Sequence, residues 1–428
     1  MASTTRLRKG RAKDAPRRAI TLAGGGPAAG LQIGALQALH EKGITFDVWA
    51  MSCIGAWVGM IYHSFDPKTA PADTKAFFRD NIFRDDQSYA GFPINHAFSP
   101  DIQQNTKSVM DFMMSPASYA NLYAPEAITR ATSMWAKYLT TPTMWNEGDT
   151  DNLMLETMAA HPASRFLVSL MYLSKVNGLS RIYFEDSTFL NQIGFENLDR
   201  ADRPFLYHNA FNLDTQAIDL FANRPEQAYA MQDQTRYSDR PPMKQVKKAG
   251  AATVCACSAL PFVEETVEIE GTTYCEGALV ETVNFDDILR IHEELDEIWV
   301  LRIVDPKQVR RPQNMKDGLA NLCMLFAGSL GKDNVLMFED RLQREKLGVK
   351  VFVVPVAHDI TFDWNVSNLM KGCEQGYANT MACIENYLHH GLHHEGMNDR
   401  VWRIDNHKNG SGYRAEAHAD HGDAIAAE

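Results

Sequence analysis

The sequence predicts an α/β fold with a mostly parallel central sheet flanked by helices, into which a long helical insertion is placed. Within the first 65 residues, an apolar strand, a tight turn and a helix follow one another twice. Strand-like segments then return only after residue 204, and the stretch between, about 65–200, has a helical pattern. Because parallel strands require crossover connections, such alternation is typical of α/β sheets. We expect one domain over 19–395.

The first strand and helix surround a glycine-rich turn. Residues 18–23 form a short apolar segment that runs into Gly24-Gly25-Gly26-Pro27. Apolar residues then recur at near-helical spacing from Leu31 to Leu39, and Gly43 is a typical residue just after a helix. These signals predict a strand, a turn and a helix in that order.

The second strand and helix are predicted at 44–51 and from about 56 to 63, with a tight turn at 52–55. The insertion that follows is rich in methionine and aromatic residues. Methionine fills irregular gaps and adapts to variable apolar ligands, so a lid over an acyl pocket and an ordinary helical core are both open. The sheet is expected to resume with strands at 204–211, 267–275, 297–304 and 349–355.

The ends of the chain differ in composition from the body. The 428 residues carry a formal charge of −12, which argues against a general nucleic-acid binder. Residues 1–18 nevertheless hold seven basic residues and one acid, and we expect a flexible arm there, either free in solution or in contact with an anionic membrane. Residues 406–428 lack periodicity and are expected to be disordered.

The expected location is the cytoplasm, with peripheral membrane contact through the arm as the alternative. The arm has no apolar core of a secretory signal, and no run of about 18 apolar residues occurs in the chain. The 7 cysteines show neither disulfide-like nor zinc-like spacing, which is typical of a reducing compartment.

Cofactor and metal sites are not expected. The glycines of Gly24–Gly30 do not have the spacing of a dinucleotide fingerprint, and the second strand ends without the acid that would hold a ribose. Four histidines near the C-terminus could share an ion at helical spacing, but no nearby acid completes a motif, so a solvated helix end is favoured. These are His389, His390, His393 and His394.

The turn after the second strand has the layout of a nucleophile elbow with Cys53 at its centre. The positive end of the following helix would lower the pKa of this thiol below its free value of about 8.5. Backbone N–H groups of Ile54, Gly25 and Gly26 would then converge as an oxyanion hole for acyl transfer. The alternative is a small buried cysteine in a tight turn, and the turn alone does not exclude it.

A third segment, 249–284, decides between these interpretations. Together with the two turns, it resembles the patatin-like phospholipase family, whose pattern is a GGG-x-[RK]-G loop, a G-x-S-x-G elbow and a distant D-G-[GA]. The resemblance covers about 18–63 and 204–304. It implies that Cys53 occupies the position of the serine nucleophile and Glu276 that of the aspartate. The oxyanion glycines correspond to Gly24, Gly25 and Gly26, and the supporting glycines of the two motifs to Gly55 and Gly277.

The departures from the family pattern keep its chemistry. A nucleophile, Cys53, replaces a nucleophile, and a carboxylate, Glu276, replaces a carboxylate, which favours function over decay. Three further positions differ: the first elbow glycine is Met51, and Ala28 and Ala29 follow the glycine loop.

The resemblance implies an acyl hydrolase that acts on lipid or other carboxylic esters. Cys53 would form a thioester acyl-enzyme, and Glu276 would act as base and then as acid. Ionised Glu276 would raise the pKa of the thiol by like-charge repulsion, so the pair is expected to share one proton. An acyltransferase or thioesterase with the same residues is one alternative, and an inactive acyl-binding or scaffold protein is another.

Other nucleophiles and bases fit the pattern less well. Ser52 precedes the apex of the turn and should face the sheet. His63 lies ten residues along the next helix, too far from Cys53 at about 1.5 Å per residue. His208 falls in the middle of a predicted strand and His40 on a helix, where packed histidines are the usual case.

Overall fold

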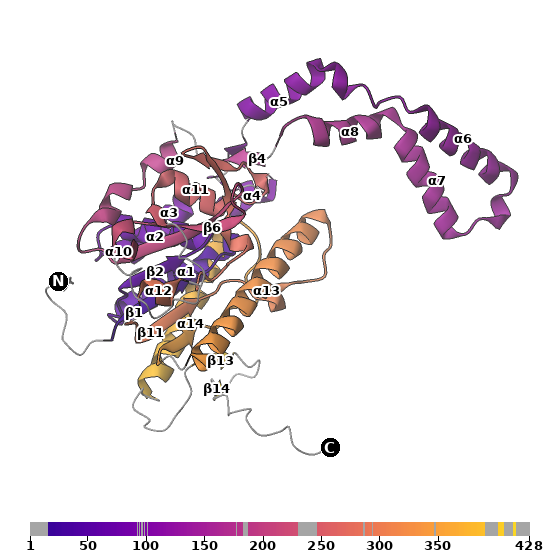
Figure 1. The fold of residues 1–428 in the computed structure, drawn as a ribbon. Coiled ribbons are helices and arrows are strands. Elements are labelled where there is room, and N and C mark those ends of the chain that lie inside the picture. Colours follow the sequence, from indigo (N-terminus) through magenta and orange to yellow (C-terminus); the bar gives the residue numbers. More distant parts are fainter. Residues whose placement is uncertain are drawn as a thin grey trace. The chain divides into compact units, whose positions relative to one another are not determined.

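The structure of the chain is a computed structural model (Figure 1). It describes residues 16–229, 246–389, 401–405 and 414–416, except for 92, 94, 96, 98, 101, 177, 183–186, 286, 293, 346 and 347. The chain divides into two compact units. One comprises residues up to Phe98 together with Ile182–Pro261 and Thr266 onward, and the other comprises Ser99–Arg181 with Phe262–Glu265.

The first unit is built on a single sheet whose central strands are parallel. The strand order is β14-β13-β12-β11-β1-β2-β5-β10-β9, and β6 and β7 extend from β5. From β13 to β5 every pairing is parallel, while β10, β9, β6 and β14 add antiparallel pairs. The predicted α/β class with a mostly parallel sheet is therefore confirmed. The strands are β1 Arg18–Leu22, β2 Val48–Met51, β5 Phe205–Asn212, β6 Ala217–Ala222, β7 Val246–Lys248, β9 Val267–Ile269, β10 Thr272–Glu276, β11 Glu297–Leu301, β12 Lys350–Val353, β13 Val401–Asp405 and β14 Arg414–Glu416.

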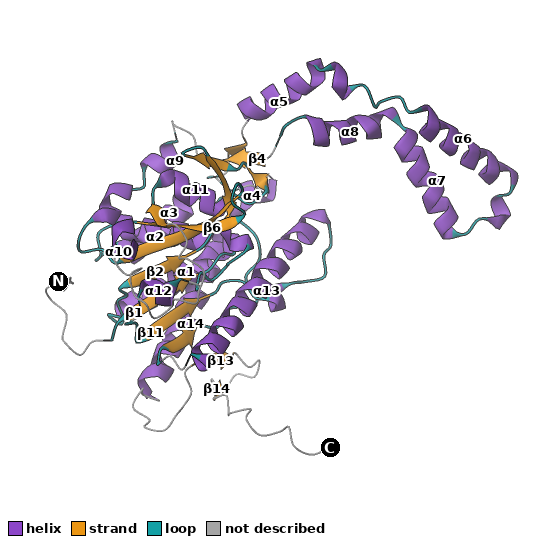
Figure 2. Ribbon diagram, in the orientation of Figure 1, coloured by secondary structure: helices purple, strands orange, loops and turns teal. Residues whose placement is uncertain are grey.

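Helices of this unit lie against the sheet (Figure 2). Short 3-10 turns occur at η1 Gly26–Ala28, η4 Phe195–Asp199, η6 Gly277–Leu279 and η7 Pro306–Gln308. The α-helices are α1 Ala29–Glu41, α2 Ile54–Ser64, α3 Ala70–Asn81, α4 Asp86–Gly91, α9 Thr188–Asn191, α10 Pro225–Tyr229, α11 Ala251–Ser258, α12 Ile288–Ile291, α13 Met315–Arg344 and α14 Val366–His389.

The sheet is buried on both faces. Along β1, Ile20 and Leu22 belong to one apolar cluster and Ala19 to a second, as expected from the alternation of side chains in a strand. Helices α1 and α14 meet on the first face at backbone contact distance, since a methyl carbon at Gly34 would lie 2.0 Å from the carbonyl oxygen of Cys373. This tight contact fixes α1, the helix that follows the glycine loop.

The second unit consists of helices and a small sheet. Its three strands, in the order β3-β4-β8, are Ser99–Pro100, Gly178–Arg181 and Phe262–Glu264. It is narrower than the predicted insertion at about 65–200, because α3 and η4 contribute to the core of the first unit. Its longer helices are α5 Ile102–Met114, α6 Pro125–Thr140, α7 Glu147–Ala160 and α8 Pro162–Leu173, with 3-10 turns η2 Pro116–Ser118 and η3 Pro142–Met144.

Some predictions concern residues that the structure leaves undescribed. Most of the basic arm, 1–15, and the side chains of the C-terminal histidine group lie outside the described residues. Within 406–428, only β14 is described, and it pairs with β13. Among the helices that can be assessed, none combines the length and the hydropathy that a membrane crossing requires.

Candidate active site

The predicted elbow is a sharp turn between β2 and α2. Cys53 precedes the first residue of α2 and has φ 50° and ψ −125°, a conformation that residues other than glycine seldom adopt. Strain of this kind costs roughly 1–3 kcal/mol and is common at active sites. The turn therefore holds the Cys53 side chain at the carboxyl end of β2, as the motif predicts.

Two glycines of α2 permit the turn to pack closely. A methyl carbon at Gly55 would lie 2.2 Å from the carbonyl oxygen of Leu22, so the helix approaches the end of β1 at backbone distance. Met51, which replaces the first elbow glycine of the family, places its sulfur 2.1 Å from where a Gly59 methyl would be. The large Met51 side chain of β2 therefore fits because Gly59 of α2 has no side chain.

Glu276 and Cys53 are neighbours although 223 positions separate them. Glu276 is the last residue of β10, directly before η6. A methyl carbon at Gly24 would lie 3.1 Å from the Cβ of Cys53 and 3.0 Å from the Cβ of Ala278, so the turn that carries Glu276 lies beside the elbow. The Glu276 amide donates to the carbonyl of Ala259 at 2.9 Å. Gly277 lets β10 approach β5, since a methyl carbon there would be 2.9 Å from the Cα of Ala210.

Burial controls the protonation of this pair. It raises the pKa of Glu276 to about 7, although the hydrogen bond from Cys53 opposes the shift. It also raises the pKa of the Cys53 thiol, and the charge of Glu276 raises it further; the Ile54 N–H lowers it by less. The predicted lowering of the thiol pKa by the helix end is therefore wrong, because burial and the adjacent carboxylate outweigh it. The resting site holds a neutral thiol.

The glycine loop approaches Cys53 from β1. A methyl carbon at Gly24 would lie 3.1 Å from the Cys53 Cβ, and the Gly24 amide donates to the carbonyl of Thr282 at 3.3 Å. Gly24 therefore lets the end of β1 lie close to Cys53. Its N–H already donates to Thr282, so the predicted oxyanion donors that remain in the loop are Gly25 and Gly26. Gly25 and Gly26 have φ values of 152° and 55°, a region that favours glycine.

Cys257 is a site residue that the sequence analysis did not identify. Its sulfur accepts the backbone N–H of Cys53 at 3.0 Å. Burial raises the pKa of Cys257, so it stays a thiol. The only sequence signal was its position in the 249–284 segment, on α11. The Cys257 sulfur therefore holds the Cys53 amide in place as its hydrogen-bond acceptor.

Ser52 is not available as the nucleophile in this geometry. It is fully buried, its amide donates to Leu22, and its hydroxyl donates to the carbonyl of Glu281 at 3.2 Å. The Asn209 side chain donates to the same carbonyl at 2.8 Å. These bonds tie the turn to the segment that follows Glu276.

The histidines considered as bases have other surroundings. His208 is completely buried, faces the Thr253 hydroxyl at 3.0 Å and stacks on Phe221; burial lowers its pKa to about 3. His63 packs edge-on against Trp49 with ring centres 4.4 Å apart. His40 lies 3.3 Å from the Tyr62 hydroxyl. None of these contacts involves Cys53.

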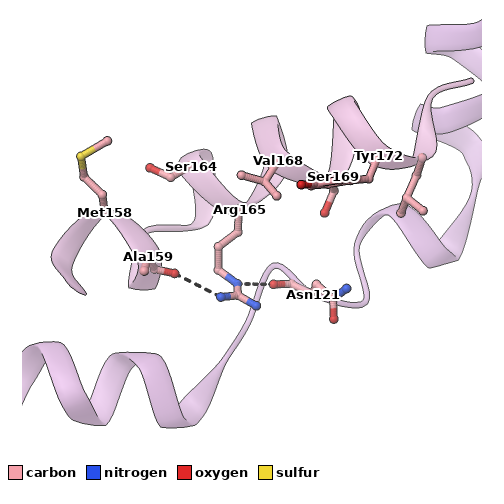
Figure 3. A pocket seen from close by; sticks show the side chains of 9 residues that line it. Asn121, Met158, Ala159, Ser164, Arg165, Val168, Ser169 and Tyr172 are labelled. Carbon is pink, nitrogen blue, oxygen red and sulfur yellow. Dashed lines mark hydrogen bonds between the residues drawn. The ribbon is translucent and has the colours of Figure 1, made fainter. Parts of the chain in front are cut away.

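A separate cavity of about 460 Å³ lies in the second unit, between α7, α8 and the loop before α6 (Figure 3). The Arg165 guanidinium donates hydrogen bonds to the carbonyls of Asn121 and, at 3.1 Å, Ala159, both of which line the cavity. No predicted site residue lines this cavity. Over the described part of the chain, no group of three or more His, Cys, Asp or Glu is arranged to hold a metal ion.

Comparison with solved structures gives distant similarities. VipD from Legionella pneumophila aligns with a TM-score of 0.34 and 13% identity over 87% of this chain and 67% of VipD. Human GIVD cytosolic phospholipase A2 aligns with a TM-score of 0.23 and 14% identity over 69% of this chain and 41% of the human protein. No curated protein matches the sequence significantly.

The family model described as patatin-like phospholipase matches residues 20–289, more than half of the chain. This range includes the glycine loop, the Cys53 elbow and the Glu276-Gly277 turn. It also includes the second unit, which contributes none of these motifs. The chain therefore belongs to the patatin-like phospholipase family, as a hydrolase of the esterase and phospholipase type.

Proposed function

We propose that the chain hydrolyses acyl esters of lipids through a Cys53–Glu276 dyad and a thioester acyl-enzyme. The observation that carries this proposal is a thiol on a strained elbow next to the turn that holds a buried carboxylate, whose charge raises the pKa of that thiol. A base is most effective when its pKa lies near the working pH, and that of Glu276 is about 7.

In the first half-reaction, the Cys53 sulfur attacks the ester carbonyl while its proton passes to the Glu276 carboxylate. The N–H groups of Gly25, Gly26 and Ile54 stabilise the negative oxygen of the tetrahedral intermediate. Collapse of the intermediate breaks the bond to the alcohol, which takes the proton from Glu276. The acyl group remains on Cys53 as a thioester.

In the second half-reaction, water attacks the thioester as Glu276 accepts one of its protons. The carboxylic acid leaves, and the proton returns from Glu276 to the sulfur, which regenerates the thiol. Because the resting thiol has a raised pKa, sulfur depends on Glu276 for activation, as a serine would. This makes the carboxylate essential in both half-reactions.

The test is ester turnover and fluorophosphonate labelling of the wild type, Cys53→Ala, Cys53→Ser and Ser52→Ala. We expect loss of turnover and labelling in Cys53→Ala and retention of both in Ser52→Ala. Cys383→Ala, another buried thiol in the first unit, is the matched control and should behave as the wild type. Unchanged turnover in Cys53→Ala would overturn the dyad.

Product analysis separates hydrolysis from acyl transfer. With an alcohol or amine acceptor added, the proposal expects free carboxylic acid as the main product. A predominant acylated acceptor would assign transferase activity to the same residues. Absence of turnover and labelling in the wild type would leave a protein that binds acyl chains without cleaving them.

A further inference from the structure

Helix α13 presents an apolar stripe to solvent beside the candidate active site. Met315, Leu319, Leu322 and Phe326 are between 46% and 93% exposed. At 3.6 residues per turn these positions fall within about 60° of the helix circumference. The stripe, defined as these four residues, is therefore one continuous ridge of roughly 16 Å.

The opposite side of the same helix is buried in the first unit. Met324 is 7% exposed and belongs to the main core, and a methyl carbon at Gly328 would lie 2.9 Å from Pro306. Asn334 accepts the N–H groups of Thr282 and Val283 at 3.0 and 3.3 Å. Because the opposite side of α13 is packed into the first unit, the stripe has a fixed orientation on that unit.

Two sets of contacts connect this helix to the dyad region. A methyl carbon at Gly331 would lie 3.8 Å from the Thr282 side chain, which in turn lies 3.7 Å from where a Gly24 methyl would be, so α13 adjoins the glycine loop beside Cys53. Lys316 forms an ion pair with Asp363 at 2.8 Å. The neighbouring Phe362 covers the glycine loop, since its ring would be 3.1 Å from a Gly26 methyl.

Positive charge gathers at the start of the stripe. Residues 307–316 contain four basic residues and no acid, in a chain whose net charge is −12. Lys307, Arg310 and Arg311 are exposed, as is Lys316, whose charge is paired with Asp363. An exposed apolar ridge with basic residues beside it is the pattern of a helix that lies on an anionic bilayer.

We propose that the stripe of α13 and the basic segment 307–316 bind the surface of an anionic phospholipid bilayer and deliver lipid to the adjacent dyad. The apolar side chains would enter the interface while the basic side chains contact the headgroups. A second copy of the chain is a weaker match, because a stable dimer buries about 800 Å² per partner from 20–30 residues. This proposal rests on the proposed lipid hydrolase function.

The test is co-sedimentation of the full chain with vesicles of phosphatidylcholine alone and of phosphatidylcholine with phosphatidylserine. We expect wild type to bind the anionic vesicles more tightly, and the triple variant L319S/L322S/F326S to bind at least about tenfold more weakly. The matched control is L213S, since this residue of the first unit is 41% exposed and follows β5, outside α13. The control should bind as the wild type.

A charge variant, K307Q/R311Q, should lose most of the preference for anionic vesicles while keeping soluble-ester turnover. The triple variant should also keep turnover of a short soluble ester and lose about tenfold in turnover of vesicle phospholipid. All proteins retain residues 1–15, so the basic arm is constant. Unchanged binding in the triple variant, equal loss in the control, or a wild-type dimer that the triple variant dissociates would each overturn the proposal.

The two proposals fail in different ways. Cys53→Ala should bind vesicles as the wild type does, because Cys53 is absent from the stripe. Loss of vesicle binding in the triple variant with retained turnover of Cys53→Ala would sustain the docking surface and reject the dyad. The reverse pattern would sustain the dyad and reject the surface.

Discussion

The carboxyl of Glu276 determines how the site should respond to pH. Its pKa of about 7 means that half of the molecules hold the ionised base near neutrality. Because the base must be ionised to take the Cys53 proton, activity should fall as pH decreases through about 7. We expect kcat/KM for a soluble ester to show an acid limb near this value, measured between pH 5 and 9.

Glu276→Gln should reduce kcat by about 10²–10⁴-fold, since glutamine cannot accept a proton from sulfur. Measurement of kcat alongside far-ultraviolet circular dichroism separates this loss from unfolding. A residual activity that retains the acid limb would show that another group accepts the proton.

Cys257 should affect the elbow without taking part in proton transfer. Cys257→Ala removes the acceptor of the Cys53 amide at 3.0 Å and leaves that N–H buried, which costs roughly 1–3 kcal/mol. We expect a lower melting temperature and a reduced kcat with the acid limb unmoved. Cys257→Ser keeps an acceptor and should recover much of both. A shifted limb in Cys257→Ala would instead assign the thiol a proton-transfer role.

At the scale of helices, two glycines should respond oppositely to the same substitution. In α1, Gly34→Ala places a methyl 2.0 Å from the Cys373 carbonyl oxygen, so α1 and α14 must separate and stability should fall by roughly 1–3 kcal/mol. In α13, Gly318 has no atom within 4 Å of the added methyl, so Gly318→Ala should stabilise by roughly 0.4–1 kcal/mol.

Urea unfolding of the two variants and the wild type measures both effects. Equal changes in the two variants would show that helix propensity alone decides them. A destabilised Gly318→Ala would indicate a contact of α13 that its surroundings in the first unit do not account for.

The elements that sequence patterns predicted best are those with local signals. The strand, turn and helix order around Gly24–Gly26 and Cys53 follows from apolar periodicity and turn residues, and the family pattern added Glu276. The 267–275 strand was predicted as continuous, but Glu270 and Gly271 adopt positive φ values and divide it into β9 and β10. Cys257 could not be recognised, because its role depends on a contact 204 positions away in the chain.

Across the whole molecule, the buried Glu276 links stability to pH. Its pKa of about 7 in the fold lies above the ordinary 4.5, so its contribution to stability is present below pH 4.5 and is lost as pH rises through 7. Relative to Glu276→Gln, the wild type should therefore lose on the order of 3 kcal/mol between pH 4.5 and 8. Urea unfolding of both proteins at the two pH values tests this. An equal change in the free energy of unfolding for wild type and Glu276→Gln would contradict the burial of the Glu276 carboxylate.

The second unit should be removable without unfolding the first. Ser99 pairs with Arg181 in the β3–β4 sheet, so the two ends of the helical segment lie side by side. Replacing 102–174 with a short glycine-serine linker should leave cooperative thermal unfolding intact, measured by circular dichroism. Loss of cooperativity would show that the first unit depends on α5–α8.

The pairing of β1 with β2 has a consequence for refolding. Leu22 stands opposite Met51, so the glycine loop and the elbow leave the sheet at the same level from adjacent strands. A slip by one residue would displace one turn from the other by about 3.3 Å and invert the faces of the strand. Chains trapped in such a register could be compact and helical yet catalytically silent, so recovered ester turnover is a stricter measure of native assembly than any spectroscopic signal.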